Sequence, residues 1–187
     1  MGYRINVKNF KYAPVTTNDD STYAIGDVKA VPGLMTVDLT LLSSTGELYG
    51  DGALTSKIAK LTGATIKLGH DKLPLADRAA MLGATVKDGI MDLATSDTPA
   101  EIAVYFETEL DNGGKEQCWL LSGKAEPIGM AAKQAEGNIN YSTDEITINF
   151  VRRLKDNKVL RLGDTDDANF TAEISTAFAA NPDASGT

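Results

Sequence analysis

Apolar and polar residues alternate with a period of two along most of this chain, which is typical of half-buried antiparallel strands. The clearest example is 101–110, where the even positions are apolar or β-branched and the odd positions include three glutamates. Asn112 and Gly113 follow, and this pair supplies the positive φ angles that a tight turn requires. Residues 116–123 then return as the partner strand. We therefore predict an antiparallel hairpin with one buried face.

The same alternation predicts further strands at 34–42, 64–70 and 138–151. In 138–151 the apolar positions change from odd to even near residue 143, and a bulge or bend would reconcile the two halves. A strand is also expected at the N-terminus, where the parity slips after Val7. Most of the chain is therefore expected to form antiparallel β-structure.

Helical patterns are few. Residues 73–83 place Pro74 near a helix start and Gly83 just past its end, which are favoured positions for these residue types. A second short helix is indicated at 170–180, where Ile174 and Phe178 are four residues apart, although this segment also alternates. The pattern as a whole predicts a mainly β fold, an antiparallel sandwich or barrel-like structure with one flanking α-helix.

Length and composition favour a single domain over residues 1–180. The chain has 187 residues, 42% of them apolar, which suffices for a core. Residues 181–187 are small and polar, and we expect a flexible tail there. No apolar run approaches the roughly 20 residues of a membrane span, and the N-terminus does not have the pattern of a secretory signal. The single cysteine, Cys118, cannot form an internal disulfide, which favours synthesis in a reducing cytoplasm.

The charge balance limits the possible partners. A formal net charge of −8 and a sequence pI of about 4.6 argue against a protein that wraps nucleic acid, because such binding needs clustered Lys and Arg. The same charge is compatible with a surface that must avoid sticking to DNA.

Signals for nucleotide or metal binding are weak. The glycines of 44–57 do not form a phosphate loop, because Thr55 and Ser56 precede Lys57 instead of following it. The acidic stretch 164–173 lacks the glycine and glutamate that a calcium loop requires at its sixth and twelfth positions. We expect no cofactor and no metal.

Signals for catalysis are equally weak. His70, the only histidine, and Cys118 are better explained as structural residues than as a general base and a nucleophile. Glu107 and Glu109 lie about 7 Å apart along one strand face, a spacing similar to a glycosidase pair, but only Tyr105 offers an aromatic platform beside them. We therefore expect no catalytic residues and a protein that is not an enzyme.

Six segments, in this order, resemble the major tail proteins (tail tube proteins) of long-tailed bacteriophages. They are VKNFKYAPVT, AVPGLMTVDL, GELYGDGAL, LPLADRAAMLG, AEIAVYFETELDNGGKEQCWLLSGKAEP and LRLGDTDD. The resemblance covers most of the chain and rests on order and spacing. The stretch ANFTAEISTAFAA departs from it, because it lacks the aromatic pair of some relatives.

The resemblance implies a structural virion protein made in the host bacterial cytoplasm. It implies that the chain assembles with itself into hexameric rings, which stack into a tail tube through which DNA is delivered. Each subunit would lend strands to a continuous inner barrel, and DNA would pass through the lumen without specific binding. The implied partners are a tape measure protein and tail terminator and distal tail proteins.

In this interpretation, residues 43–60 are an extended assembly loop that contacts a neighbouring subunit or ring. Glycines allow the backbone to bend. The apolar side chains could be buried against a partner, and the charged side chains could fix the position of the contact. The candidate contact residues are Gly46, Leu48, Tyr49, Gly50, Asp51, Leu54 and Lys57. The alternative is a surface loop without a partner.

The odd face of 101–110 is a candidate for the lumen lining. Its residues are Glu101, Tyr105, Glu107 and Glu109. Repeated around a ring, these carboxylates would repel DNA phosphates, and a polymer that does not bind can slide. The alternative is that this face lies outside the tube or under the helix.

Two other functions remain open. One is the tube of a phage-derived bacteriocin or related injection apparatus, whose subunits would have very similar sequences. The other is a carbohydrate-binding or adhesion β-sandwich on a virion, which would need an exposed aromatic platform.

Overall fold

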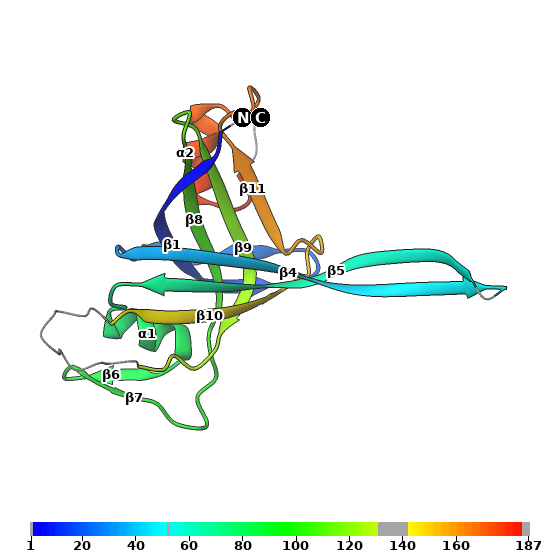
Figure 1. Cartoon of the computed structure of the whole chain (residues 1–187). Coiled ribbons are helices and arrows are strands. Elements are labelled where there is room, and N and C mark those ends of the chain that lie inside the picture. Colours follow the sequence, from blue (N-terminus) through cyan, green and yellow to red (C-terminus); the bar gives the residue numbers. More distant parts are fainter. Residues whose placement is uncertain (1, 52, 131–141, 185–187) are drawn as a thin grey trace, which may run out of the picture.

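A computed structural model describes residues 2–51, 53–130 and 142–184 (Figure 1). The strands are β1 (Arg4–Asn18), β2 (Tyr23–Ile25), β3 (Lys29–Ala30), β4 (Leu34–Gly50), β5 (Ala53–His70), β6 (Thr85–Lys87), β7 (Ile90–Asp92), β8 (Glu101–Leu110), β9 (Lys115–Ala125), β10 (Asp144–Val151) and β11 (Leu160–Asp164). The helices are α1 (Leu75–Leu82) and α2 (Ala172–Ala180). The predicted fold class, mainly antiparallel β, is confirmed. The described residues contain two helices, the flanking helix of the predicted fold and the second short helix indicated at 170–180.

One large antiparallel sheet organises the molecule, with the strand order β2-β1-β8-β9-β10-β5-β4. Strand β9 pairs with β8 along one edge, and along its other edge it pairs with β11 over 116–120 and with β10 over 122–125. The short strand β3 pairs with β1, while β6 and β7 form a separate ribbon near α1 (Figure 1). The sheet curves around the core, as expected for a barrel-like structure.

The predicted β8–β9 hairpin is confirmed. Gly113 in its turn has φ = 84°, whereas Asn112 does not have the positive φ that was predicted for it. The expectation that only one of its faces is buried was wrong. Both faces are covered, because α2 and β2 pack on the side opposite to the main core. Figure 1 shows α2 alongside β8.

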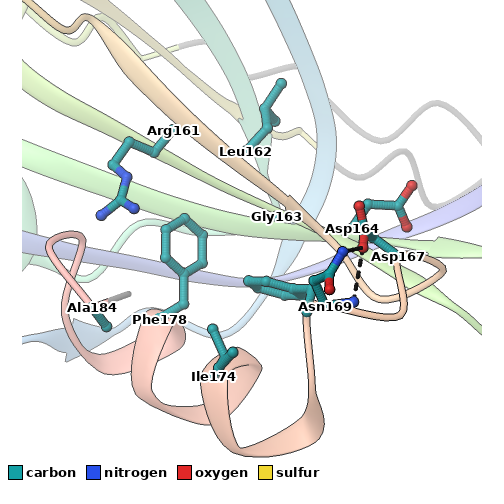
Figure 2. A pocket seen from close by; sticks show the side chains of 10 residues that line it. Arg161, Leu162, Gly163, Asp164, Asp167, Asn169, Ile174, Phe178 and Ala184 are labelled. Atoms are coloured by element: carbon teal, nitrogen blue, oxygen red, sulfur yellow. Dashed lines mark hydrogen bonds between the residues drawn. The ribbon is translucent and has the colours of Figure 1, made fainter. Parts of the chain in front are cut away.

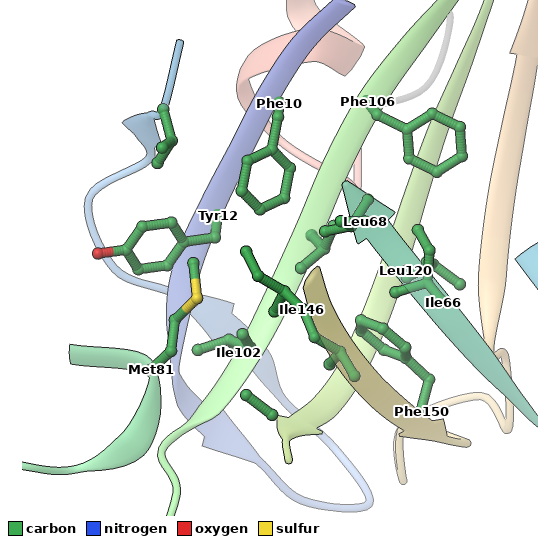
Figure 3. Close-up of a cluster of buried hydrophobic side chains, with 14 of the residues drawn as sticks. Phe10, Tyr12, Ile66, Leu68, Met81, Ile102, Phe106, Leu120, Ile146 and Phe150 are labelled. Carbon is green, nitrogen blue, oxygen red and sulfur yellow. The ribbon is translucent and has the colours of Figure 1, made fainter. Parts of the chain in front are cut away.

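The main core fills the inside of the curved sheet (Figure 3). Its largest members are Phe10, Tyr12, Ile66, Leu68, Met81, Ile102, Phe106, Leu120, Ile146 and Phe150. Alternate residues of β5, β8 and β10 point inward, as their period-two patterns predict. A second cluster, on the outer face of β8 and β9, contains Tyr23, Tyr105, Trp119, Leu121 and Phe178.

The predicted parity slip in the N-terminal strand is a β-bulge. The register of β1 against β8 shifts between Lys8 and Lys11, and Asn9 has φ = 56°. The second half of the strand predicted at 138–151 corresponds to β10, which begins at Asp144. Its residues Ile146, Ile148 and Phe150 are buried. Residues 138–141, in its first half, lie outside the described residues.

Both helices have the predicted boundaries to within two residues. Pro74 immediately precedes α1, and Gly83 ends it with φ = 70°, where an added Cβ would lie 2.2 Å from the carbonyl oxygen of Thr98. Thr171 caps α2 by accepting a hydrogen bond from the Ile174 amide. None of the helices among the described residues is long and apolar enough to cross a membrane.

Residues 181–184, which belong to the segment expected to be a flexible tail, contact the body of the protein. The Asp183 carboxylate accepts a hydrogen bond from the buried guanidinium of Arg153 at 2.6 Å, and the Pro182 carbonyl accepts one from Arg161. Residues 185–187 lie outside the described residues.

Candidate assembly interface

Strands β4 and β5 continue together as a hairpin beyond the rest of the sheet (Figure 1). The ladder between β10 and β5 runs from Ala64 to His70, whereas the ladder between β4 and β5 continues to the pair of Gly50 and Ala53. The departure occurs at Gly63, where an added Cβ would lie 2.6 Å from the carbonyl oxygen of Phe150. We call residues 43–51 and 53–62 the arm. The sequence predicted a loop here, and the structure has two paired strands.

The two faces of the arm carry different side chains. The face of Glu47 and Lys57, which we call the polar face, also carries Leu61, and the face of Leu48 and Ile58, which we call the apolar face, also carries Lys60. Glu47 pairs directly with Lys57, and the two side chains form an ion pair of 2.8 Å. Tyr49 follows on the same side of β4, and its hydroxyl donates a hydrogen bond of 2.9 Å to Glu47. The hydrogen bond from Lys57, together with that from Tyr49, lowers the pKa of Glu47 below its usual value.

The apolar face carries Leu48 and Ile58. Gly46 pairs with Ile58 in the ladder, and Leu48 is two residues further along β4, so these three residues share one side of the ribbon. The side chains of Leu48 and Ile58 are 62% and 67% exposed. A Cβ added at Gly46 would meet nothing within 4 Å. This surface of the isolated chain is therefore open and flat enough to take a partner.

Of the predicted contact residues, the structure brings Leu48, Tyr49 and Lys57 together on the arm. Asp51 lies in its turn with φ = 50°, while the backbones of Gly50 and Leu54 belong to the last pairs of the ladder. Ile58 was missed by the sequence analysis. The sequence offered no period-two signal for it, because the even and the odd positions of 54–61 both mix apolar and polar residues.

The face predicted to line a lumen is partly buried in the single chain. Tyr105 has 0% exposure and packs on Trp119 at 5.1 Å between ring centroids, beneath α2. Glu107 is 4% exposed and accepts hydrogen bonds from Tyr105 at 2.6 Å and Asn9 at 2.8 Å. This burial agrees with the alternative considered above, a position under the helix, and the lumen lining stays a prediction.

The ionisation of Glu107 follows from its contacts. Burial opposes its charge, but the hydrogen bonds from Tyr105 and Asn9 and the charge of Lys115 outweigh burial and lower its pKa. Burial and the hydrogen bond to Glu107 raise the pKa of Tyr105. The pair is therefore a neutral phenol that donates to a carboxylate.

Glu101 and Glu109, the other two predicted lining residues, are half-buried and have partners. Glu101 accepts hydrogen bonds of 2.7 Å from Asn18 and from Ser122. Glu109 forms an ion pair with Lys8, which offsets its charge. The side chains of these two residues reach solvent in part, unlike those of Tyr105 and Glu107.

The two residues considered for catalysis, Cys118 and His70, are both buried. Burial raises the pKa of the Cys118 thiol to about 12, so this residue stays protonated. His70 is fully buried, with its ring edge-on to Phe10 at 6.4 Å. Within the described ranges, no group of three or more His, Cys, Asp or Glu residues could hold a metal ion.

An open pocket of about 530 Å³ lies between β11 and α2 (Figure 2). Phe178 and Ile174 of α2 lie on the side of β11 near Gly163, while the side chain of Leu162 points away from α2. The acidic residues at its end are engaged in their own turn, since Asp167 accepts hydrogen bonds from the backbone and side-chain nitrogens of Asn169. The pocket shows no arrangement of groups for catalysis.

Comparisons with known proteins extend only to structure. No protein-family profile matches the chain, and no curated protein sequence matches it. A chain in the cryo-EM structure of the anti-feeding prophage cap (AFP tube terminating cap) is similar, with a TM-score of 0.51 and 12% identity over 87% of this chain and 93% of that chain. At this identity, the likeness shows a shared fold.

Two further solved chains show weaker likeness. One is from the extended sheath-tube complex of an extracellular contractile injection system, PVC, with a TM-score of 0.48 and 14% identity over 86% of this chain and 92% of that chain. The other is from the six-fold symmetrised anti-feeding prophage baseplate, with a TM-score of 0.42 and 12% identity over 87% of this chain and 97% of that chain.

Proposed function

We propose that this protein is a structural subunit of a phage-tail-like tube, and that copies of the chain assemble with one another through the arm. The observation that carries the proposal is the projection of the arm beyond the sheet with Leu48 and Ile58 exposed on one face. The shared fold with a tube-terminating cap chain supports the same class of protein.

The physical reason is that exposed strand edges and apolar side chains are liabilities in a single chain. A long edge strand can pair with other chains unless a partner covers it, and a closed ring of subunits provides such a partner. In the described residues, β4 is the last strand of the sheet, so its outer edge has no hydrogen-bonded neighbour. Assembly would cover this edge and the apolar face of the arm.

The finer proposal is a tail tube of stacked hexameric rings in a virion, through which DNA reaches the host. Its partners would be further copies of the chain, a tape measure protein, and tail terminator and distal tail proteins. Glu101 and Glu109 are the remaining candidates for the lumen lining. Replacing both with Lys should slow DNA ejection from assembled tails while leaving tube length unchanged, and a normal rate of ejection would contradict this assignment.

A second candidate is a tube or cap subunit of a contractile injection system. The observation that favours it is the fold shared with the anti-feeding prophage cap chain. The two candidates differ in cargo. Particles that contain this chain would carry DNA in the first case, and tubes without a DNA genome would support the second.

The test of self-assembly is negative-stain electron microscopy and light scattering of the purified protein. We expect rings or tubes with a central hole. A variant in which residues 44–61 are replaced by Asn-Gly removes the arm, and it should remain a folded monomer. Ile90→Ser is the matched control, because Ile90 is also an exposed apolar residue at 64% but lies on the β6–β7 ribbon. A wild-type protein that stays monomeric at every concentration would refute the proposal.

A further inference from the structure

The curved sheet leaves a seam between β4, its last strand, and the start of β1. These two strands lie near each other without hydrogen-bonded pairing between them. The seam is closed beside Phe10, whose carbonyl oxygen accepts a hydrogen bond of 2.9 Å from the Val31 amide. It is open beside residues 4–7, where a groove of about 500 Å³ lies between β1 and β4. We call this feature the seam groove.

The seam groove exposes apolar side chains that lead directly into the main core. Phe106, a core residue, lies at its base, and the partly buried Val37 forms one wall. At its rim, Ile5, Met35 and Leu162 are 66%, 54% and 63% exposed. Three large apolar side chains around one concave surface form a continuous patch, and such patches mark binding sites.

Polar side chains also line the groove. Arg4 and Glu116 form an ion pair there, and Asn6 and Thr108 add hydrogen-bonding groups. Protein–protein interfaces likewise combine apolar contacts with hydrogen-bonding groups. The arm offers both kinds of group on one face, because Leu48 and Ile58 share it with Lys60.

The arm of the same chain cannot fill this groove. Met35 and Val37, which line the groove, belong to β4, and the arm is the continuation of this strand. Eleven residues separate Val37 from Leu48, which corresponds to roughly 36 Å along an extended strand. Figure 1 shows the arm running away from the body in this direction. Any arm that occupies the groove must therefore come from a second copy.

We propose that the seam groove of one copy receives Leu48 and Ile58 of the arm of a second copy. This inference rests on the self-assembly proposed above and names the surface that the arm contacts. Each copy has one arm and one groove, so the contact is heterologous. A heterologous contact generates a ring if the rotation closes and an open helical filament if it does not. The arm–groove contact thus supplies a physical basis for repeated assembly.

The test is site-specific cross-linking between two variants that each carry one added cysteine, Leu48→Cys and Met35→Cys. Both positions are exposed, so the substitutions should leave the fold intact, and the native Cys118 is buried at 2% exposure. Treating an equimolar mixture with a short bifunctional maleimide should give a covalent dimer on a denaturing gel. A single chain with both substitutions should give a ladder of covalent oligomers.

The matched control is a mixture of Leu48→Cys with Ile90→Cys, which has an equally exposed apolar position on the β6–β7 ribbon. At least tenfold more dimer should form with Met35→Cys than with Ile90→Cys. Equal yields in the two mixtures would overturn the arm–groove contact. In addition, Met35→Asp should weaken self-association at least tenfold while leaving the thermal midpoint unchanged, and unchanged association would also overturn the proposal.

Failure of this inference can be separated from failure of the proposed function. Tubes without the specific cross-link would refute the seam groove as the acceptor and leave the tube proposal standing. The specific cross-link in a sample that forms only short oligomers would support the arm–groove contact and contradict the tube. A protein without self-association would refute both.

Discussion

Glu47 and Lys57 form an ion pair of 2.8 Å across the arm, on the face opposite to Leu48 and Ile58. Both charged side chains are solvent-exposed, so the pair contributes little to folding stability. The charges of Glu47 and Lys57 are thus paired within the chain, whereas Leu48 and Ile58 on the other face are 62% and 67% exposed.

The first prediction concerns the apolar face of the arm. Leu48→Ser together with Ile58→Ser should abolish self-association, because these side chains would be buried only in the assembly. The free energy of unfolding of the monomer should change by less than about 0.5 kcal/mol, as is usual for exposed positions. Sedimentation velocity and urea unfolding measure the two effects. Glu47→Gln with Lys57→Gln is the control on the polar face, and an equal loss of association there would contradict an interface confined to the apolar face.

The second prediction concerns Gly46. A side chain at this position meets nothing within 4 Å in the isolated chain, so Gly46→Arg should fold normally and block close approach of a partner. Size-exclusion chromatography should show monomers where the wild type shows assemblies. Gly129→Arg is the matched control, because Gly129 also has no atom within 4 Å of an added Cβ but lies outside the arm. If Gly46→Arg assembled like wild type, the apolar face would not be in tight contact.

The third prediction concerns Arg153, whose guanidinium is 2% exposed and lies 4.8 Å from the centre of the Tyr23 ring. It donates two hydrogen bonds to Asp156, at 2.6 and 2.7 Å, and one to Asp183 at 2.6 Å. Arg153→Met removes these bonds and should cost about 2–4 kcal/mol of unfolding free energy. Urea unfolding at pH 7 measures the loss, and Arg153→Lys should recover only part of it, because Lys lacks the planar fork.

The same cluster makes stability depend on acid. The hydrogen bonds from Arg153 lower the pKa of Asp156, and for Asp183 burial is outweighed by the bond and charge of Arg153, so that pKa is also lowered. Carboxyls with lowered folded-state pKa values stabilise the protein above their unfolded pKa of about 4 and lose this effect as pH falls below it. Arg153→Met should therefore lose less stability than wild type between pH 5 and about pH 2. If wild type and Arg153→Met lost equal unfolding free energy over this pH range, the acid sensitivity would not come from the bonds of Arg153 to Asp156 and Asp183.

The fourth prediction separates two glutamates of β8. Glu107→Lys places a cation in the buried site beside Tyr105 and Lys115, and we expect a loss of about 2–4 kcal/mol of unfolding free energy. Glu109→Lys, at a partly exposed position, should cost clearly less than Glu107→Lys. Thermal and urea unfolding of the two variants measure the difference. Equal effects would show that the burial of Glu107 beneath α2 is unimportant for the fold.

Local patterns account for much of the fold. Alternation predicted β8, β9, the inward face of β5 and the apolar positions of β10, because a strand that covers a core on one side must bury every second residue. Pro74 and Gly83 marked the ends of α1, since the backbone at these points needs their conformations. The parity slip after Val7 marked the bulge at Asn9.

The burial of Tyr105 and Glu107 could not be read from the sequence of β8. An odd face with glutamates resembles a solvent face, and the residues that cover it come from α2, more than 60 positions later in the chain. The arm was located but its structure was not, because a glycine-rich segment with short polar residues has the composition of a loop. Pairing between β4 and β5 supplies the hydrogen bonds that make it a ribbon.

The sequence by itself determined the antiparallel β-class, the main hairpin, the helix ends and the position of the projecting segment, because these depend on residues that are neighbours along the chain. Only the tertiary structure decided which face of β8 is covered, that the arm has an apolar and a polar side, and that β1 and β4 leave an open groove between them. These features depend on contacts between segments that are distant in sequence, and no local pattern of polarity records which distant segment will supply the contact.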